Sequence, residues 1–457
     1  MGSNRTSRRQ FLKRAAGASA GAFAFPYFVR SSALGMADQK GANSRIVVGA
    51  IGLGGQGTSI MNALMKMPDT QVVAVCDVDQ GIIATEGRKA RQGREIARKV
   101  VEDYYAAQNN LPAYKGCDAY GDFREMLARK DIDVVTICTP DHWHGLISIA
   151  AAKAGKDIYC EKPLVNVISE GRAVCDAVKK YRRVLQTGSQ ERSNPKIRFA
   201  CELVRNGRLG KIHTVRINLP MSDGHHKQVV TWTESQPEMP VPEGFDYDFW
   251  LGPNPHAYYT AKRCHFWWRF ILATGGGEMT DRGAHIIDLA QLGLGMDDTG
   301  PVEFVARGER NKSGLFDTFM KYDFQCTYAN GIKMIGSNDT PRGLRFEGDK
   351  GSIFIHIHGG ELEATPASLL EEKIGADEIQ LGRTDDHRRQ FIECVKNRGT
   401  PFAPAEVGHR TAAICHLLNI AMITGSPLKW DPTKEQITNN AEANRMLSRP
   451  MRPPWHL

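Results

Sequence analysis

The chain has 457 residues, which is enough for two domains and excludes a single small module. Its composition, 41% hydrophobic and 24% charged, indicates a globular protein with a core and excludes collagen-like, low-complexity and disordered classes. The formal net charge is +8, but six basic residues and no acidic residue precede Asp38, and without those six the remainder carries +2. The excess charge therefore belongs to the first segment, and we expect no nucleic-acid partner.

The first 37 residues carry the pattern of an export signal. Two arginines, Arg8 and Arg9, precede a weakly apolar run from Ala15 to Phe28, and small residues follow. This order resembles a twin-arginine signal peptide, so we predict a signal at residues 1–37 and a linker at 38–44. Such a precursor uses the twin-arginine export machinery, which predicts a periplasmic or secreted mature protein. The alternative is a disordered basic tail on a cytoplasmic protein.

The cleavage site remains open between two pairs of small residues: Ser31 with Ala33, and Gly35 with Ala37. No other stretch reaches the roughly 18 apolar residues of a membrane span, so the mature protein is not expected to be integral to a membrane. The ten cysteines form no C-x-x-C pair, which argues against a zinc ribbon or a redox dithiol. Several follow apolar residues, and we expect buried, reduced thiols.

Between residues 45 and 190 the apolar pattern alternates between strand and helix periods. We expect strands at 45–51, 71–76, 132–138, 156–160 and 183–187, and helices at 58–67, 80–108, 122–128, 144–154 and 169–181. Strands that alternate with helices favour a Rossmann domain, with a doubly wound parallel sheet.

Residues 191–430 have a different pattern and predict a second α/β domain. Strands are expected at 211–217, 302–306, 320–328, 332–335 and 352–356, and helices at 196–206, 281–292, 386–397 and 411–424. Runs of strands without intervening helices favour an antiparallel or mixed sheet. Residues 221–262 are expected to form long loops, and residues 431–457 a C-terminal tail.

A dinucleotide-binding pattern begins where the first strand ends. Gly52, Gly54 and Gly57 form G-x-G-x-x-G between a predicted strand and a predicted helix. Such glycines let the backbone approach a pyrophosphate at the helix N-terminus. Asp77 ends the next strand, where a carboxylate accepts hydrogen bonds from the adenosine ribose. No Arg or Lys follows in Val78-Asp79, so the pattern favours NAD over NADP.

Further motifs carry a family resemblance over about residues 45–430. They are Thr139-Pro140 with His144, Glu161-Lys162-Pro163, Gly275-Gly276-Gly277, and Asp281 with His285. With these motifs the chain resembles the Gfo/Idh/MocA oxidoreductases. The resemblance implies a Rossmann domain followed by an α/β domain with an open, largely antiparallel sheet. It also implies a sugar or polyol substrate between the two domains and a homo-oligomer, either a dimer or a tetramer.

The resemblance assigns three catalytic roles. It implies that His285 is the general base, Asp281 its partner, and Lys162 the polar group that holds the substrate hydroxyl. Asp281 and His285 are four residues apart on a predicted helix, which places both on one face. Lys162 follows a strand end, at the sheet edge where ligands bind in doubly wound folds, and a lysine there stabilises a developing alkoxide.

The remaining candidate residues line the two predicted binding sites, and no metal site is expected. The cofactor site is predicted to contain Gly52, Gly54, Gly55, Gln56, Gly57, Asp77, Thr139, Pro140, His144, Glu161 and Lys162. The substrate site is predicted to draw on Gln190, Arg192, His225, Trp268 and Arg269.

We therefore predict an NAD-dependent oxidoreductase that acts on a sugar or polyol hydroxyl. Because no free nicotinamide pool is expected outside the cytoplasm, export predicts a tightly held cofactor that is recycled between substrates. An NAD-dependent glycosidase, which works by transient oxidation, elimination and re-reduction, is the main alternative. A metal enzyme and a non-enzymatic sugar-binding protein are weaker alternatives, because no metal-ligand spacing is complete and the Lys, Asp and His set is intact.

Overall fold

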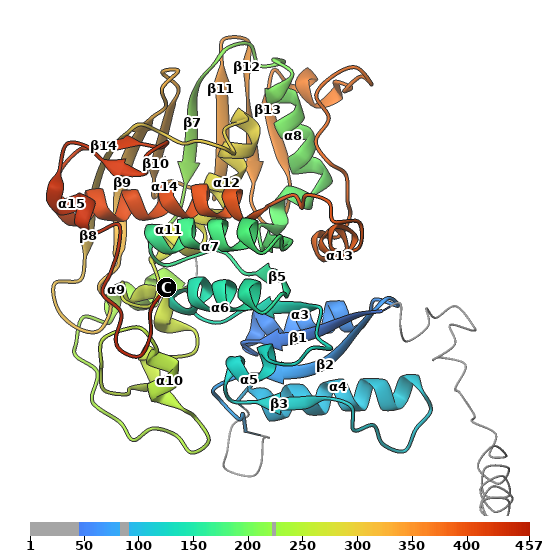
Figure 1. Cartoon of the computed structure of the whole chain (residues 1–457). Coiled ribbons are helices and arrows are strands. Elements are labelled where there is room, and N and C mark those ends of the chain that lie inside the picture. Colours follow the sequence, from blue (N-terminus) through green and yellow to red (C-terminus); the bar gives the residue numbers. More distant parts are fainter. Residues whose placement is uncertain (1–44, 83–90, 222–224) are drawn as a thin grey trace, which may run out of the picture. The chain divides into compact units, whose positions relative to one another are not determined.

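The structure, a computed structural model, describes residues 45–82, 91–221 and 225–457, and of residues 225–227 it describes the backbone alone. Residues 46–457 form one compact unit (Figure 1). The predicted signal and linker, residues 1–44, lie outside the described residues.

Six parallel strands form the first sheet, in the order β3-β2-β1-β4-β5-β6. The strands are β1 (Ile46–Ile51), β2 (Thr70–Cys76), β3 (Asp118–Tyr120), β4 (Val134–Ile137), β5 (Asp157–Cys160) and β6 (Leu185–Thr187). The helices are α3 (Gly55–Met65), α4 (Arg94–Gln108), α5 (Phe123–Leu127), α6 (Asp141–Lys153) and α7 (Ile168–Lys180). This order is that of dinucleotide-binding sheets, and it confirms the predicted doubly wound fold.

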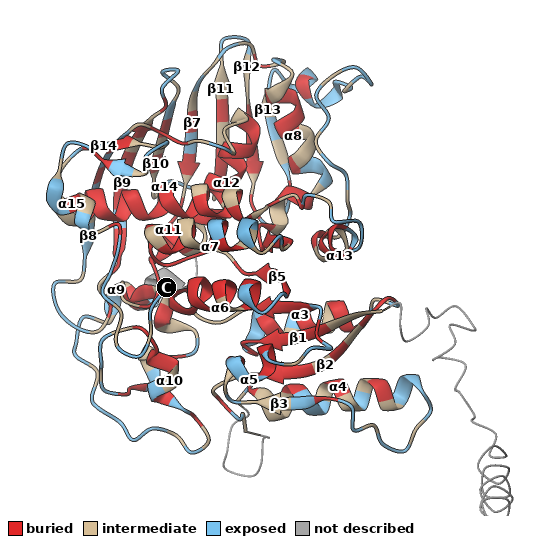
Figure 2. Cartoon of the chain, in the orientation of Figure 1, coloured by how far each residue is buried: buried red, intermediate tan, exposed pale blue. Residues whose placement is uncertain are grey.

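Apolar residues cover both faces of this sheet. One face packs against α3 and α4, and the other against α5, α6 and α7. Figure 2 shows α6 buried along most of its length. The first face is completed by α13 (His387–Asn397), whose Phe391 and Ile392 are fully buried in the same cluster as Val48 and Ile60. A segment far along the chain therefore returns to the parallel sheet.

Nine strands form the second sheet, in the order β13-β12-β11-β7-β10-β9-β8-β14-β15. They are β7 (Ile212–Asn218), β8 (Glu303–Arg310), β9 (Phe319–Thr327), β10 (Lys333–Ser337), β11 (Gly343–Gly348), β12 (Gly351–His356), β13 (Leu362–Thr365), β14 (Leu428–Asp431) and β15 (Gln436–Ile437). Strands β7 and β10 pair in parallel and the other pairs are antiparallel, so the expected largely antiparallel sheet is confirmed.

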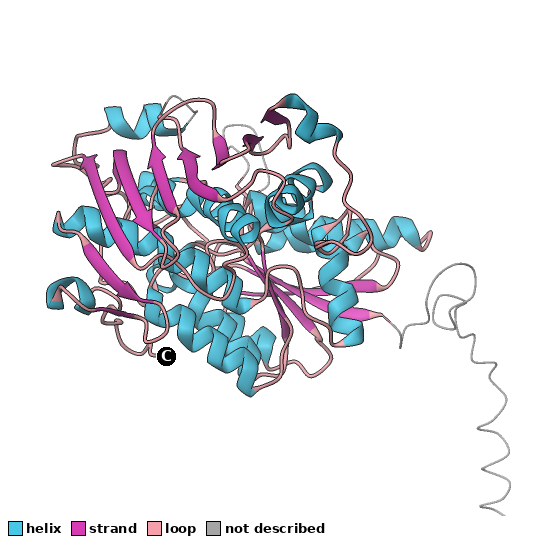
Figure 3. Ribbon diagram, turned by 90° about the horizontal axis from the view of Figure 1, so that it is seen from above, coloured by secondary structure: helices cyan, strands magenta, loops and turns pink. Residues whose placement is uncertain are grey.

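Helices lie between the two sheets (Figure 3). The core of the second sheet includes residues of α8 (Pro195–Arg205), α12 (Gly283–Leu294) and α14 (Ala405–Thr424). Helix α14 contacts both α7 and β8, so it packs on both layers of the molecule. It is buried on nearly all sides, which is typical of a helix enclosed by protein. The smaller helices include α9 (His225–Thr231), α10 (Tyr247–Leu251), α11 (Glu278–Asp281) and α15 (Ala441–Arg445).

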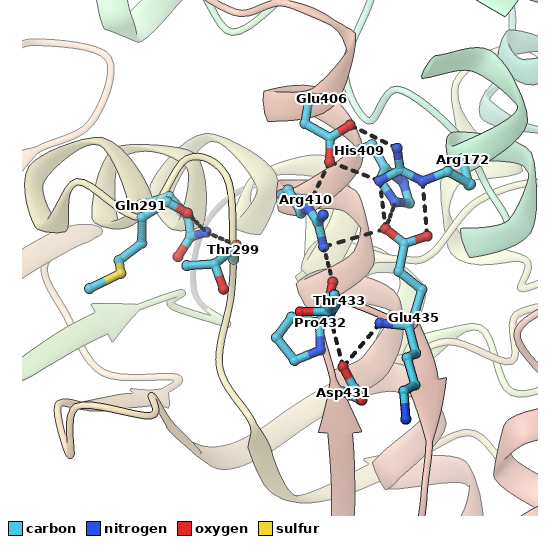
Figure 4. A network of polar contacts seen from close by, with 12 residues as sticks. Arg172, Gln291, Thr299, Glu406, His409, Arg410, Asp431, Pro432, Thr433 and Glu435 are labelled. Atoms are coloured by element: carbon cyan, nitrogen blue, oxygen red, sulfur yellow. Dashed lines mark hydrogen bonds and ion pairs between the residues drawn. The ribbon is translucent and has the colours of Figure 1, made fainter. Parts of the chain in front are cut away.

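An ion-pair network fastens α14 to its neighbours (Figure 4). Arg172 of α7 bridges Glu406 of α14 at 2.8 Å and Glu435, in the turn between β14 and β15, at 2.6 Å. His409 Nε2 lies 2.8 Å from Glu435, and Arg410 pairs with Glu406 at 2.8 Å. Burial alone would raise the pKa of each glutamate, but the hydrogen bonds and charges of the side chains around them, Arg172 foremost for Glu406, lower both pKa values to about 2.

The structure corrects several predicted elements. The helix expected at 281–292 is broken at Arg282, where α11 ends and α12 begins one residue later. Helix α14 starts six residues earlier than expected, because Glu406, Gly408 and Arg410 interrupt the apolar pattern of its first turns. The helix expected from residue 80 begins at Arg94, and residues 83–90 lie outside the described part. Five short strands were not predicted: β3, β11, β13, β14 and β15.

All ten cysteines lie within the described ranges; each is unpaired, and nine are buried, as expected. In the part of the chain that the structure describes, no helix combines the length and apolarity needed to cross a bilayer. Over the same residues, no three or more His, Cys, Asp or Glu side chains converge as metal ligands would.

Candidate active site

A cleft of about 880 Å³ runs along the carboxyl ends of the parallel strands. Its lining includes most of the predicted cofactor and catalytic residues, together with residues that follow β7. We call the part around Lys162, Asp281 and His285 the reacting end. The part around Asp77, Asp79 and Gly121 is the adenosine end.

The glycine turn between β1 and α3 is shaped for close approach. Gly52 has φ +81°, and a Cβ there would meet the backbone of Cys138 and Thr139. A Cβ on Gly57 would overlap the carbonyl of Gly52. Gly54 and Gly55 have open space on their Cβ side, at the point where α3 begins. The turn fits a pyrophosphate, because the N-terminus of α3 offers backbone amides and no side chain stands between these amides and the cleft.

Asp77 closes the turn after β2 at the adenosine end. Its carboxylate accepts hydrogen bonds from the amides of Leu53, at 2.6 Å, and of Asp79, at 2.9 Å. Burial raises the pKa of Asp77 to about 6, and the two amides oppose that rise. Asp79 is itself paired with Arg91 Nε at 2.5 Å. The carboxylate is thus held beside the glycine turn, where an adenosine ribose would lie.

A charged pair forms the reacting end. Lys162 Nζ donates to the carbonyl of Asp281 at 2.7 Å and to its carboxylate at 2.9 Å. Arg269 Nε approaches the same carboxylate at 3.4 Å. Burial alone would raise the pKa of Asp281, but Lys162 and Arg269 hold it well below its ordinary value. Asp281 therefore stays ionised and fixes the direction of the Lys162 ammonium.

The prediction that Asp281 and His285 lie on one helix is wrong, because α11 ends at Asp281 and α12 begins at Gly283. The amide of His285 bonds to the carbonyl of Arg282, which tightens the chain at the break between α11 and α12. Within the described residues no hydrogen bond joins Asp281 to His285. His285 Nδ1 is buried and has no hydrogen-bond partner among the described residues. Burial and the nearby Lys162 lower the pKa of His285 well below its ordinary value.

Glu161 and His144 hold the framework of the cleft. Glu161 accepts hydrogen bonds from Gln56 at 3.0 Å and from Gln190 at 3.3 Å, so it joins the glycine turn to the start of the second half. The His144 ring lies between the carbonyls of Thr139, at 2.9 Å, and Pro163, at 2.7 Å. Each ring nitrogen of His144 faces a backbone carbonyl, so the side chain links the segments that follow β4 and β5. Only the ring carbons of His144 then face the cleft.

The predicted substrate residues separate into three groups. Gln190, Trp268 and Arg269 line the cleft, and the Arg269 guanidinium lies 4.4 Å over the Trp268 ring. Arg192 is absent from the described lining, because it is buried in ion pairs with Asp288 and Asp297, both at 2.7 Å. The side chain of His225 lies outside the described residues.

Two features of the cleft were not predicted. Asp141, directly after Thr139-Pro140, is buried in the lining, and burial raises its pKa well above the ordinary value. Its place immediately after a strand end was the signal available in the sequence. Residues 243–250 also reach the adenosine end, and Phe245 pairs with Asp79 through the backbone. No local pattern signals that long-range contact.

Two family models together match nearly all of the described chain. One, described as the oxidoreductase family, NAD-binding Rossmann fold, matches residues 46–189. The other, described as the oxidoreductase family, C-terminal alpha/beta domain, matches residues 193–457, which is more than half of the chain.

Curated relatives include dehydrogenases and a glycosidase. A levoglucosan dehydrogenase of Pseudarthrobacter phenanthrenivorans is 28% identical over 62% of this chain and 66% of its own length. A myo-inositol 2-dehydrogenase of Thermotoga maritima is 29% identical over 37% of this chain and 44% of its own. An alpha-N-acetylgalactosaminidase of Shewanella oneidensis is 24% identical over 45% of this chain and 44% of its own. The matched regions thus span less than two thirds of each relative.

Solved structures share the fold. An aldose-aldose oxidoreductase of Caulobacter crescentus, complexed with glycerol, has a TM-score of 0.57 and 20% identity, over 84% of this chain and 99% of its own. The WlbA dehydrogenase of Bordetella pertussis, in complex with NADH and UDP-GlcNAcA, has a TM-score of 0.57 and 17% identity, over 85% of this chain and 99% of its own. At these identities the likeness concerns the fold alone.

Proposed function

The chain belongs to the Gfo/Idh/MocA oxidoreductase family, and from that premise we propose that it oxidises a sugar or polyol hydroxyl by NAD-dependent hydride transfer. One observation carries the proposal. The Lys162–Asp281 pair and His285, whose Nδ1 has no hydrogen-bond partner among the described residues, line the same cleft as the glycine turn. A hydroxyl placed there would have a hydrogen-bond donor and a proton acceptor beside it. The sugar and inositol dehydrogenases among the relatives support the substrate class.

The residues of the protein have separate roles in the reaction. Two of the three N–H groups of Lys162 go to Asp281, which leaves one to donate to the substrate oxygen and stabilise its developing charge. His285, with its lowered pKa, is neutral near pH 7 and takes the hydroxyl proton. When bound, NAD supplies the hydride acceptor. The rigid ion pair keeps the lysine in place before the substrate arrives.

We propose NAD rather than NADP as the cofactor. The carboxylate of Asp77 lines the part of the cleft where a 2′-phosphate would lie and would repel it. Arg91 is already paired with Asp79 and donates to the carbonyl of Glu243 at 3.0 Å, so its charge is offset. The Rossmann family match supports a dinucleotide but does not discriminate between the two.

Export and cofactor retention form a second part of the proposal. The twin-arginine pattern at Arg8-Arg9 supports folding and cofactor loading before export to the periplasm or beyond. NAD would then be held tightly and reset on the enzyme, by a second substrate or within a redox-neutral cycle. Protein recovered from a periplasmic fraction and cleaved after Ala33 or after Ala37 would support this, and an uncleaved cytoplasmic product would contradict it.

The outer face of the nine-stranded sheet supports a homo-oligomer, either a dimer or a tetramer. Helices α8, α12 and α14 pack on the inner face, whereas the other face carries exposed residues such as Val305, which is 42% exposed. Analytical ultracentrifugation tests this proposal, and a monomer at micromolar concentration would contradict it.

The glycosidase remains the second candidate, on two observations. A relative named alpha-N-acetylgalactosaminidase matches 45% of the chain. The reacting end also holds an acid that simple hydride transfer does not require, Asp141, and its raised pKa suits a proton donor. The same Lys162 and His285 would serve the transient oxidation.

The deciding experiment starts from protein purified without added nucleotide. The protein is denatured and the supernatant is assayed for NAD(H) and NADP(H); near-stoichiometric NAD is expected. Assays with paired sugars and with aryl glycosides then separate the two candidates. Release of the aryl group without net redox change would favour the glycosidase. Retention of NADP, or an empty site with turnover only on added NAD, would contradict the proposed cofactor or its tight binding.

A further inference from the structure

Residues 243–250, which we call the clasp, cross from the second half of the chain to the adenosine end of the cleft. Phe245 forms an antiparallel bridge with Asp79. The amide of Gln80 donates to the carbonyl of Gly244 at 2.9 Å, and the amide of Asp246 donates to the carbonyl of Val78 at 3.1 Å. The clasp is thus joined through the backbone to the same turn that positions Asp77.

The clasp brings aromatic rings to the lining of the cleft. Phe245, Phe249 and Trp250 all line it, together with Phe123 and Gly121 from the parallel-sheet side. In dinucleotide sites of this fold, the space beyond the ribose carboxylate receives the adenine base. Flat apolar rings suit the faces of a base, so the chemistry of this wall fits adenine.

A separate segment, residues 451–455, fastens the clasp from outside. Arg452 donates to the Asp248 carboxylate at 2.5 Å, to the Asp248 carbonyl at 2.8 Å and to the Gly252 carbonyl at 3.0 Å. The Trp455 ring packs edge-on against Phe249, with centroids 5.4 Å apart, and against Trp143 at 4.7 Å. Neither Arg452 nor Trp455 is among the described residues that line the cleft.

The inner side of the clasp is held by α6. Trp143 Nε1 donates to the carbonyl of Trp250 at 3.0 Å. Gly252 has φ +54°, and a Cβ there would overlap the Trp143 indole, so only a glycine fits against this ring. The clasp is therefore held by both α6 and residues 451–455, which contact each other through Trp143 and Trp455.

We propose that the clasp is part of the dinucleotide site, that it covers the adenosine half of NAD, and that the fastening by Arg452 and Trp455 limits cofactor release. The inference rests on the proposed NAD-dependent function. Release of the adenosine half then requires the Arg452–Asp248 pair and the Trp455–Phe249 contact to open together. Retention of the cofactor is thus assigned to a segment outside the parallel-sheet half of the chain.

The test measures release of NADH from the full chain. Protein loaded with NADH is mixed with excess NAD, and the loss of NADH fluorescence gives the dissociation rate. We expect Arg452→Ala and Trp455→Ala each to raise this rate by about 10-fold, the range for losing a charge-assisted hydrogen bond or a buried aromatic contact. His456→Ala, whose exposed ring bonds only to the Pro454 carbonyl, is the matched control and leaves the rate unchanged.

A double-mutant cycle separates the clasp from general destabilisation. Asp248→Asn is a mild change at an exposed residue, and it is expected to raise the rate less than Arg452→Ala does. The double variant Asp248→Asn/Arg452→Ala should release NADH no faster than Arg452→Ala alone, because both changes break one contact. Additive effects in the double variant, or release rates equal to that of His456→Ala, would overturn the proposal that the clasp limits cofactor release. Failure of the unmodified protein to bind NADH would instead refute the proposed cofactor.

Discussion

The two ends of the cleft are built by different means. At the reacting end, Lys162 and Asp281 are charged, largely buried and in direct contact at 2.9 Å. At the adenosine end, the Asp77 turn is held by backbone hydrogen bonds and covered by the apolar clasp. The reacting end therefore depends on the identity of single side chains, whereas the adenosine end depends on a surface to which many residues contribute.

This difference predicts different responses to mutation. Loss of one buried charge leaves its partner unpaired, so single changes at the reacting end should be severe. Losses at the adenosine end remove one contact among several and should be graded. The reacting end should govern the rate of chemistry, whereas the adenosine end should govern which cofactor is held and for how long.

The largest effect is expected for Lys162→Met. This change removes the donor that stabilises charge on the substrate oxygen, so kcat should fall by about 10³-fold. NAD content, measured after denaturation, should stay near that of the unmodified protein. Lys153→Met, an exposed lysine at the end of α6, is the control and should keep full activity. A fall in kcat of less than threefold for Lys162→Met would count against the assigned role.

His285→Asn should lower kcat by about 10²-fold, because the proton acceptor is lost. The pH profile sharpens the assignment. With its pKa lowered by burial and Lys162, His285 stays neutral down to low pH, so kcat/KM should fall only well below the pH at which an ordinary histidine is protonated. Asp281→Asn removes a charge that favours the imidazolium, so the acid limb should move to still lower pH. An acid limb of the kcat/KM profile that moves to higher pH in Asp281→Asn would contradict the assignment of His285 as the proton acceptor beside Asp281.

At the adenosine end, Asp77→Asn should raise the Kd for NAD by about 10-fold, since a charged acceptor of ribose hydrogen bonds is lost. The preference for NAD over NADP should shrink at the same time, because one carboxylate no longer repels a 2′-phosphate. Equilibrium binding of NAD and of NADP to protein freed of its nucleotide measures both effects. An unchanged ratio of the two Kd values would show that Asp77 does not set cofactor choice.

The smallest effect is expected far from either end, in the network of Figure 4. Glu435→Gln should lower Tm by about 2 °C, the scale of a partly exposed ion pair in a large domain. Because the pKa values of Glu406 and Glu435 are lowered to about 2, the network stabilises the fold above about pH 4.5. Its contribution is lost as the pH falls toward 2. The difference in Tm between variant and unmodified protein should therefore shrink over that window, with NAD retention at neutral pH unchanged.

Sequence patterns predicted the parallel sheet well because its strands are buried on both faces and read as continuous apolar runs. Strand β1 and the turn at Gly52 followed directly from such a run and its glycines. Strand β11 was missed, since glycines bound it and Arg345 interrupts its apolar residues. Strands β14 and β15 have only four and two residues, too few to show a period.

The site was predictable only as far as its residues lie near strand ends. Lys162 and Asp77 follow strands of one sheet, so the fold itself brings them to one edge. The pairing of Lys162 with Asp281 is different, because a spacing of four residues suggested an Asp281–His285 pair and gave no sign of the break at Arg282. Arg192 looked available for substrate, yet Asp288 and Asp297, distant in sequence, occupy its guanidinium.

Helix α13 fixes the order in which the chain can mature on the ribosome. The last parallel strand ends at Thr187, but Phe391 and Ile392 are needed to fill the core beneath α3. While roughly the next two hundred residues are still being synthesised, the nascent parallel sheet keeps an apolar patch open to water. The patch closes when α13 leaves the exit tunnel and Arg389 reaches Asp69 at 2.6 Å. Chaperones that bind exposed apolar surface should therefore hold this nascent chain until translation is nearly finished.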